Sequence, residues 1–185
     1  MLKENFKNKL IESFNDNQHD NLNVGGLILF MENSDVNYYM ADLNGPMGMA
    51  TINGVYIDIN NILSKFGFPI GTNTMLLYFI ILHETAHMKR IIKLGKDKVL
   101  EKLSLTDFND FFEHIINEEL IADNYGCLIY YLLNKKKYPS YYTQNLGDAK
   151  NKERYKQTAR GFYGQIQNDE TKYNKLVNRF IKKIY

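Results

Sequence analysis

The chain has 185 residues, of which 44% are hydrophobic and 24% are charged, and its net charge is +2. This length and composition predict a globular domain with a buried core, and they exclude an intrinsically disordered or collagen-like chain. A single cysteine, Cys127, excludes an intramolecular disulfide framework. The longest apolar run, residues 75–82, is too short to cross a membrane.

The first residues contain no apolar segment of the kind that signal peptides carry. We therefore expect a soluble protein without a membrane partner. The expected location is the cytoplasm, or the inside of a larger assembly into which the chain is packaged.

Charge is distributed unevenly along the chain. Residues 135–185 hold 13 Lys and Arg against 4 Asp and Glu, a net of +9, whereas residues 1–134 have a net charge of −7. We divide one domain, residues 1–185, into a core at about 24–134 and a basic helical extension at 135–185. The extension suits contact with an acidic protein or nucleic acid. Two solvated Lys-rich helices are a simpler explanation of the positive charge, because no nucleic-acid-binding motif is present.

The first third of the chain contains one predicted helix and several β-like runs. Residues 2–15 carry apolar side chains at helical spacing, which predicts an amphipathic helix. Short β-like runs follow at residues 24–31, 36–43 and 50–59, separated by turn-forming residues. Within the last run an Asn-Gly pair interrupts the apolar pattern and indicates a bulge or a tight turn. We expect a small antiparallel meander.

The middle of the chain is predicted to hold the central helix. Residues 61–66 favour a short helix, and a much longer one begins after Thr72 or Thr74, either of which can cap it. This longer helix is predicted to end at Gly95. Because its first half is apolar nearly all round, we expect it to be buried at the centre of the fold.

Three further helices are predicted after this one. The first runs from about residue 108 to 133, because Pro139 prevents its continuation. The other two, at residues 148–167 and 170–184, lie in the basic extension. We find no internal repeat.

Residues 83–87 of the central helix read HETAH. His-Glu-x-x-His on a helix places two imidazoles one turn apart on one face, so that His83 and His87 can bind one Zn²⁺. Glu84 then stands where a general base is needed. The alternative explanation is a buried helix whose two histidines are satisfied by other partners.

A catalytic zinc takes three protein ligands and keeps a fourth position for water. The helix predicted at residues 108–133 offers five candidates for the third ligand: Glu113, His114, Glu118, Glu119 and Asp123. Glu119 lies on a stripe that is apolar one turn earlier and acidic one turn later, and buried carboxylates need a cation or hydrogen-bond donors. Glu118 is expected to be more exposed. We therefore predict Glu119 as the third ligand.

Asp123, one turn beyond Glu119, has a different predicted role. A zinc-bound histidine usually donates its other ring N–H to a carboxylate, which fixes the tautomer and strengthens the ligand. We expect Asp123 to accept this hydrogen bond from His83 or His87. Small residues on both helices favour close packing at this point.

The two motifs together resemble those of the gluzincin metallopeptidases, in which an HExxH helix is followed by a second helix bearing ExxxD, often ExxAD. HETAH and the run ELIAD from Glu119 to Asp123 match both halves. The resemblance covers roughly residues 49–127, and small HExxH domains of the ImmA/IrrE kind are nearest in size and layout. The extended metzincin motif does not fit, because Arg90 and Lys93 stand where it requires Gly and His.

This resemblance implies a zincin-like α+β fold. A small antiparallel sheet would pack on the HExxH helix and on a second ligand-bearing helix, followed by the C-terminal helical extension. The β-run at residues 49–58 would be an edge strand that holds an extended substrate. An electrophilic group would stand opposite the base, and the candidates for it are Tyr155, Arg160 and Tyr163.

The sequence therefore predicts a zinc-dependent metallopeptidase with one Zn²⁺ as cofactor and a peptide or protein as substrate. Glu84 would take a proton from water and pass it to the leaving amine. The rival prediction is a zincin-fold structural or interaction module in a larger assembly, for example a virus or phage particle, with little or no activity. The basic third and the many tyrosines suit contact surfaces. Glu84 favours the enzyme, because holding a metal does not require it.

Overall fold

The computed structural model describes residues 2–15, 22–44, 46–64, 72–103 and 108–136. Over these residues the fold is α+β, with six helices and one three-stranded sheet. The helices predicted at 148–167 and 170–184 lie outside the described residues, as do the candidate electrophiles Tyr155, Arg160 and Tyr163.

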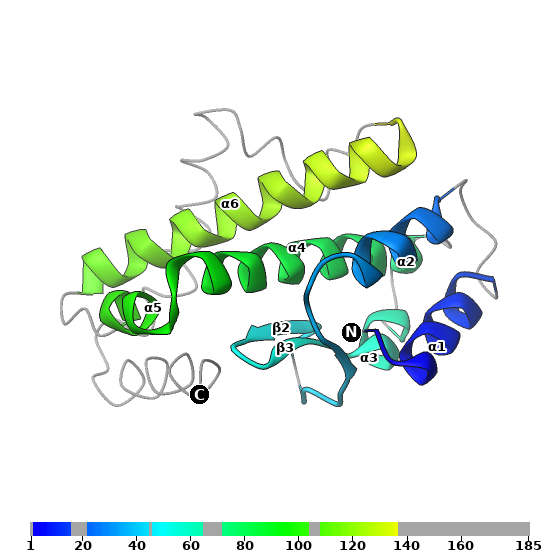
Figure 1. The fold of residues 1–185 in the computed structure, drawn as a ribbon, viewed down its shortest axis with the longest axis horizontal. Coiled ribbons are helices and arrows are strands. Elements are labelled where there is room, and N and C mark those ends of the chain that lie inside the picture. The colour runs from blue at the N-terminus through cyan, green and yellow to red at the C-terminus, as the bar shows by residue number, and fades with distance from the viewer. Residues whose placement is uncertain (1, 16–21, 45, 65–71, 104–107, 137–185) are drawn as a thin grey trace.

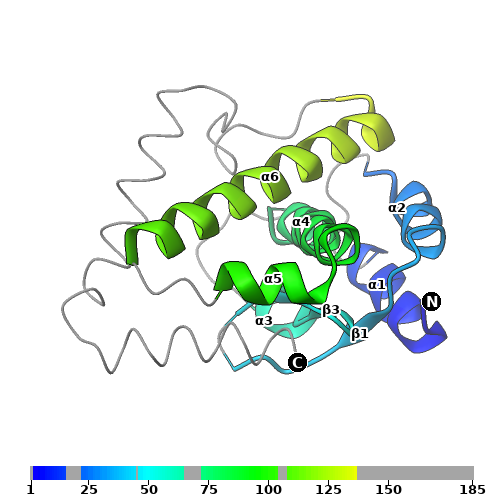
Figure 2. The same ribbon diagram turned by 60° about the vertical axis from the view of Figure 1, so that its left-hand side comes forward.

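The helices are α1 (Glu4–Asn15), α2 (Val24–Glu32), α3 (Ile59–Leu63), α4 (Thr72–Leu94), α5 (Lys96–Leu103) and α6 (Phe108–Asn134). The strands are β1 (Tyr38–Met40), β2 (Gly48–Thr51) and β3 (Gly54–Ile57). Figures 1 and 2 show α4 between α6 on one side and the small sheet on the other. The predicted central position of the HETAH helix is therefore confirmed.

The sheet differs from the predicted antiparallel meander. Its strand order is β1-β3-β2, with β3 antiparallel to β2 but parallel to β1. The run predicted as one strand at residues 50–59 is a hairpin, because the chain reverses between Thr51 and Gly54. Gly54 has φ +144°, and a Cβ there would lie 2.4 Å from the carbonyl oxygen of Asn37. The tight turn was thus predicted correctly, whereas the parallel pairing was not.

The strand predicted at residues 24–31 is wrong, because this segment forms α2. The Asn23 side chain caps the helix by accepting a hydrogen bond from the Gly26 backbone N–H at 2.8 Å. Leu27, Ile28 and Met31 then share the buried side of the helix. A short apolar run fits a buried strand and a helix equally well, and the cap decides for the helix.

The connection after α4 also contains an element that the sequence did not predict. Gly95 adopts φ +80° and ends α4 at the predicted position. The helix α5 begins at the next residue and buries Val99. The predicted short helix near residues 61–66 is present as α3, capped by the Asp58 carboxylate.

The core lies on both sides of the first half of α4. Leu77, Tyr78 and Ile81 are fully buried there. The Tyr78 ring packs edge-on against Tyr130 of α6, with ring centroids 5.5 Å apart. Close contact of α4 with α6 also depends on Gly126, since a Cβ at this position would lie 3.0 Å from the Phe79 ring. This half of the helix pair is held by apolar packing.

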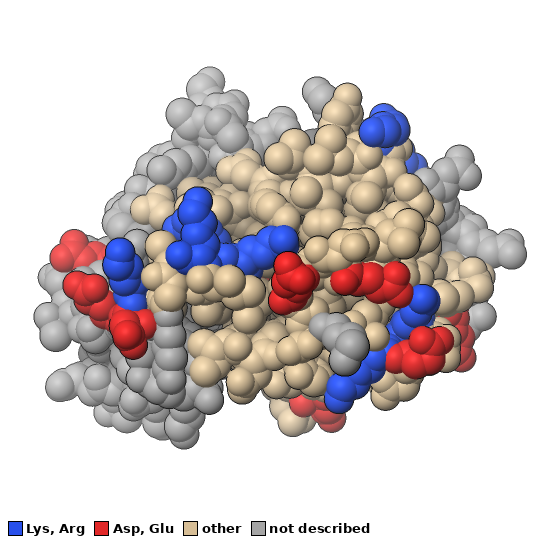
Figure 3. Space-filling model, in the orientation of Figure 1, with Lys and Arg blue, Asp and Glu red and all other residues tan. Residues whose placement is uncertain are grey.

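None of the helices in the described part of the chain is long and apolar enough to span a membrane. On the face drawn in Figure 3, several Lys and Arg side chains adjoin one another left of centre, and Asp and Glu side chains lie to their right. The basic extension lies almost wholly outside the described residues, so its predicted acidic or nucleic-acid partner stays a prediction.

Candidate metal centre

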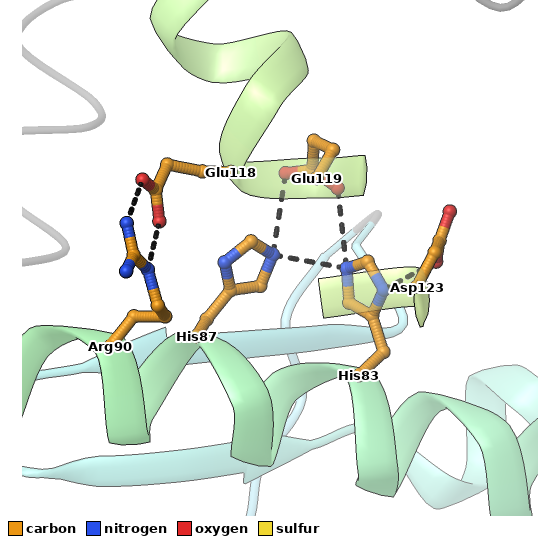
Figure 4. A network of polar contacts seen from close by, with 6 residues as sticks. All are labelled: His83, His87, Arg90, Glu118, Glu119 and Asp123. Atoms are coloured by element: carbon orange, nitrogen blue, oxygen red, sulfur yellow. Dashed lines mark hydrogen bonds and ion pairs between the residues drawn. The ribbon is translucent and has the colours of Figure 1, made fainter. Parts of the chain in front are cut away.

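Two helices contribute six polar side chains to one cluster (Figure 4). On α4, positions i, i+4 and i+7 share one face of the helix. The α4 residues are His83, His87 and Arg90, and the α6 residues that meet them are Glu118, Glu119 and Asp123. The spacing of the α4 residues therefore aims all of them at the same helix, α6.

His83, His87 and Glu119 converge on one point. The Nε2 atoms of the two histidines lie 3.1 Å apart. The Glu119 carboxylate reaches both rings, with Oε2 3.2 Å from His83 Nε2 and Oε1 3.5 Å from His87 Nε2. One ligand atom from each residue lies within 4.8 Å of the other two. The three residues predicted as a ligand set are thus brought together.

The three side chains lie close enough together that they could hold one metal ion. Metal–ligand bonds of 2.0–2.2 Å at tetrahedral angles place neighbouring ligand atoms about 3.3–3.6 Å apart. The two imidazole nitrogens lie 3.1 Å apart, slightly closer than this range, and each Glu119 oxygen lies 3.2 or 3.5 Å from a different imidazole. Two imidazole nitrogens and a carboxylate oxygen are also the donor types that zinc prefers.

Asp123 contacts His83 from the side of the ring away from Glu119. Its Oδ1 lies 2.7 Å from Nδ1 of His83, and this is the predicted contact. Because an ionised carboxylate can only accept, Nδ1 carries the proton. Nε2 of His83 faces Nε2 of His87 and the Glu119 carboxylate, and in the neutral ring Nε2 carries a lone pair. Protons on these nitrogens, or a cation held between the three groups, would satisfy the Glu119 carboxylate.

The pKa shifts of His83 and Glu119 show that the cluster favours a positive charge. Burial acts to lower the pKa of His83, but hydrogen bonds to Asp123 and Glu119 outweigh it and hold the pKa well above its usual range. Burial acts to raise the pKa of Glu119, yet hydrogen bonds from His83 and His87 hold it well below its usual range. The carboxylates thus favour a positive charge at the point where the three ligands meet.

The prediction that Glu118 is more exposed than Glu119 is wrong. The Glu118 side chain is 16% exposed against 33% for Glu119. Glu118 accepts two hydrogen bonds from Arg90, from Nε at 3.1 Å and from Nη2 at 2.8 Å. Burial acts to raise the Glu118 pKa, but Arg90 holds it below its usual value. Only the packing of α4 on α6 reveals this partner, which lies 28 residues away in sequence.

Glu84, the predicted general base, lies beside strand β2. A Cβ on Gly48, the first residue of β2, would lie 2.7 Å from Cγ and 3.0 Å from Oε1 of Glu84. The same Cβ would lie 2.7 Å from the Ile80 side chain. Only glycine allows the strand to pass this close to the carboxylate. The sequence alone did not predict this contact.

The predicted edge strand is present in part, since β2 is at the sheet edge whereas β3 is central. Val55 of β3 donates its N–H to Asn37 on the β1 side, and the Ile57 carbonyl also faces that side. Alternation in an antiparallel pair means that their β2 partners, Gly48 and Ala50, direct N–H and C=O away from β3. Among the described residues no strand pairs with this edge.

The opposite face of α4 is fixed by a buried hydrogen-bond chain. The Thr85 hydroxyl, within the HETAH motif, lies 2.9 Å from the hydroxyl of Tyr38 on β1. Tyr38 in turn lies 3.1 Å from the Ser34 hydroxyl. Thr85 also donates to the Ile81 carbonyl at 2.6 Å. Thr85, which lies between His83 and His87 in the sequence, thus links the helix to the sheet.

No protein-family model matches the chain, and neither a curated protein nor a solved structure matches it. What can be said of the site therefore rests on its own geometry.

Proposed function

We propose that the protein is a zinc-dependent metallopeptidase. One observation carries this proposal: His83, His87 and Glu119 converge next to Glu84, and Glu84 lies beside a strand whose outer edge pairs with no other strand among the described residues. A zinc ion held by these three side chains supplies Lewis-acid polarisation of a carbonyl and a water of lowered pKa.

Other groups of the chain transfer the proton, orient His83 and bind the substrate. Glu84 takes a proton from the attacking water and returns it to the leaving amine. Asp123 keeps His83 in the tautomer whose Nε2 lone pair faces the metal position. An extended peptide pairs with the backbone groups of Gly48 and Ala50, in the manner of an added strand. The substrate is therefore an unfolded peptide or an extended loop of a protein, met in the cytoplasm or within an assembly.

The decisive experiment compares zinc-loaded wild type with Glu84→Gln on a peptide library. The amide keeps the size of the side chain but cannot accept the proton, so cleavage falls about 10²–10⁴-fold. Zinc content stays the same, because Glu84 is not a ligand. Asp97→Asn, a charge removal on the exposed side of α5, serves as control and keeps wild-type activity. Equal cleavage by wild type and Glu84→Gln would remove Glu84 from the mechanism.

A structural or interaction module in a larger assembly is the second candidate. Ile121, Leu128 and Leu132 point outward from α6 and are 40–56% exposed. Together they make an apolar stripe opposite the side that packs on α4, and apolar patches of this kind mark contact surfaces. If zinc-loaded wild type cleaves no member of the library, this second function replaces the first.

A further inference from the structure

The ion pair between Arg90 and Glu118 lies at the border of the metal centre, and the roles given above do not include it. Both guanidinium contacts, at 3.1 and 2.8 Å, go to the same carboxylate. Such a two-point contact fixes the angle as well as the distance between partners. The side chains are 27% and 16% exposed, so the pair is largely withdrawn from water.

The position of this pair along the helices is specific. Arg90 follows His87 by one turn on the same face of α4, and Glu118 immediately precedes Glu119 on α6. On the other side of Glu119, one turn later, Asp123 contacts His83. The third ligand therefore lies between two polar links that join α6 to α4.

We propose that Arg90 and Glu118 are positioning residues that hold Glu119 within reach of the two histidines. This inference rests on the proposed metal site but not on peptide hydrolysis. Sequence neighbours on one helix move together, so the clamp on Glu118 restrains the backbone that carries Glu119. Without Arg90 the largely buried Glu118 carboxylate would lose its ion-pair partner, which is costly, so it would turn toward solvent and shift the backbone of α6.

Charge alone makes a different prediction from positioning. A positive side chain near a bound cation disfavours that cation and a negative one favours it. Charge alone therefore predicts that Arg90→Gln strengthens zinc binding and that Glu118→Gln weakens it. Positioning predicts that both substitutions weaken binding, and that the exchanged pair Arg90→Glu with Glu118→Arg recovers most of the loss.

The experiment measures zinc affinity by competition with a chelator, on the folded full-length chain. We expect each single substitution to weaken zinc by roughly tenfold or more, as losses around a ligand shell commonly do. Lys93→Gln is the control, because it removes an exposed positive charge from the same helix and leaves Arg90 in place. Urea denaturation of the metal-free variants separates loss of fold from loss of metal geometry.

Three results would overturn the inference: opposite signs for the two single substitutions, wild-type affinity in both, or no recovery in the exchanged pair. Wild type that fails to bind zinc at all would overturn it as well, together with the proposed function. Wild type that binds zinc but cleaves nothing would remove the peptidase proposal alone, and the clamp would still be tested by affinity.

Discussion

The two halves of the antiparallel contact between α4 and α6 are built from different chemistry. In one half Tyr78 packs on Tyr130, and Phe79 packs on Gly126. In the other half the contacts are charged or hydrogen-bonded, and they join His83, His87 and Arg90 to three carboxylates. The change from apolar to polar contacts occurs within one turn of α4.

This difference indicates that the apolar half mainly stabilises the fold, whereas the polar half holds the proposed metal site. Apolar packing depends mainly on volume and tolerates small shifts. A metal centre depends on the distances between a few atoms, and errors of about 1 Å matter. We therefore expect substitutions in the apolar half to change the free energy of unfolding and those in the polar half to change metal affinity or activity.

The largest effect is expected from Leu77→Ala, in the apolar half. Leu77 is fully buried, so truncation removes burial and leaves a cavity. The free energy of unfolding should fall by about 2–5 kcal/mol in urea denaturation. Leu29→Ala is the control, because this leucine of α2 is 60% exposed and its loss should have little effect. Zinc affinity of folded Leu77→Ala should match wild type. A parallel loss of affinity would contradict the claim that the two halves have separate roles.

A smaller effect is expected from Gly48→Ala, which changes the strand beside Glu84. The added Cβ would lie 2.7 Å from both Glu84 Cγ and Ile80 Cγ2, so these side chains or the strand must shift, and the contact between β2 and the carboxylate changes. A displaced base should slow peptide cleavage roughly 10²-fold while zinc stays bound. Gly25→Ala is a matched control, because a Cβ there meets nothing closer than 4.0 Å. Unchanged cleavage by Gly48→Ala would show that Glu84 does not need its present position.

The smallest effect is expected from Asp123→Ala. Within the polar half, this substitution distinguishes a residue that orients a ligand from a ligand itself. The substitution removes the acceptor that orients His83 but removes no proposed ligand. Zinc affinity should fall by roughly 10–100-fold, and binding should persist. A complete loss of zinc, equal to that of Glu119→Ala, would mean that the roles of Asp123 and Glu119 had been exchanged.

The sequence predicted the elements whose signal is local. The ends of α4 and α6 follow from a glycine, a proline and long apolar periodicity, and the His83–His87 pair follows from a fixed helical spacing. Glu119 and Asp123 could be predicted because they too are one turn apart on a single helix. Each prediction started from a short pattern within one helix, HETAH on the first and ELIAD on the second.

The sequence did not predict features that depend on how elements meet. The parallel pairing of β1 with β3 arises from the path of the chain between distant strands. The Arg90–Glu118 pair requires the register of α4 against α6, which no short sequence pattern contains. The helix α2 was missed for another reason, because its apolar run has no clear period and only the Asn23 cap identifies it.

X-ray absorption at the zinc edge of the zinc-loaded protein tests the central claim most directly. The account predicts one zinc per chain, bound by two imidazole nitrogens and by oxygen at about 2.0–2.2 Å. It also predicts no sulfur ligand, although Cys127 lies on α6 as well. A sulfur neighbour at about 2.3 Å, or zinc bound by fewer than two imidazoles, would contradict the claim that His83, His87 and Glu119 form the site.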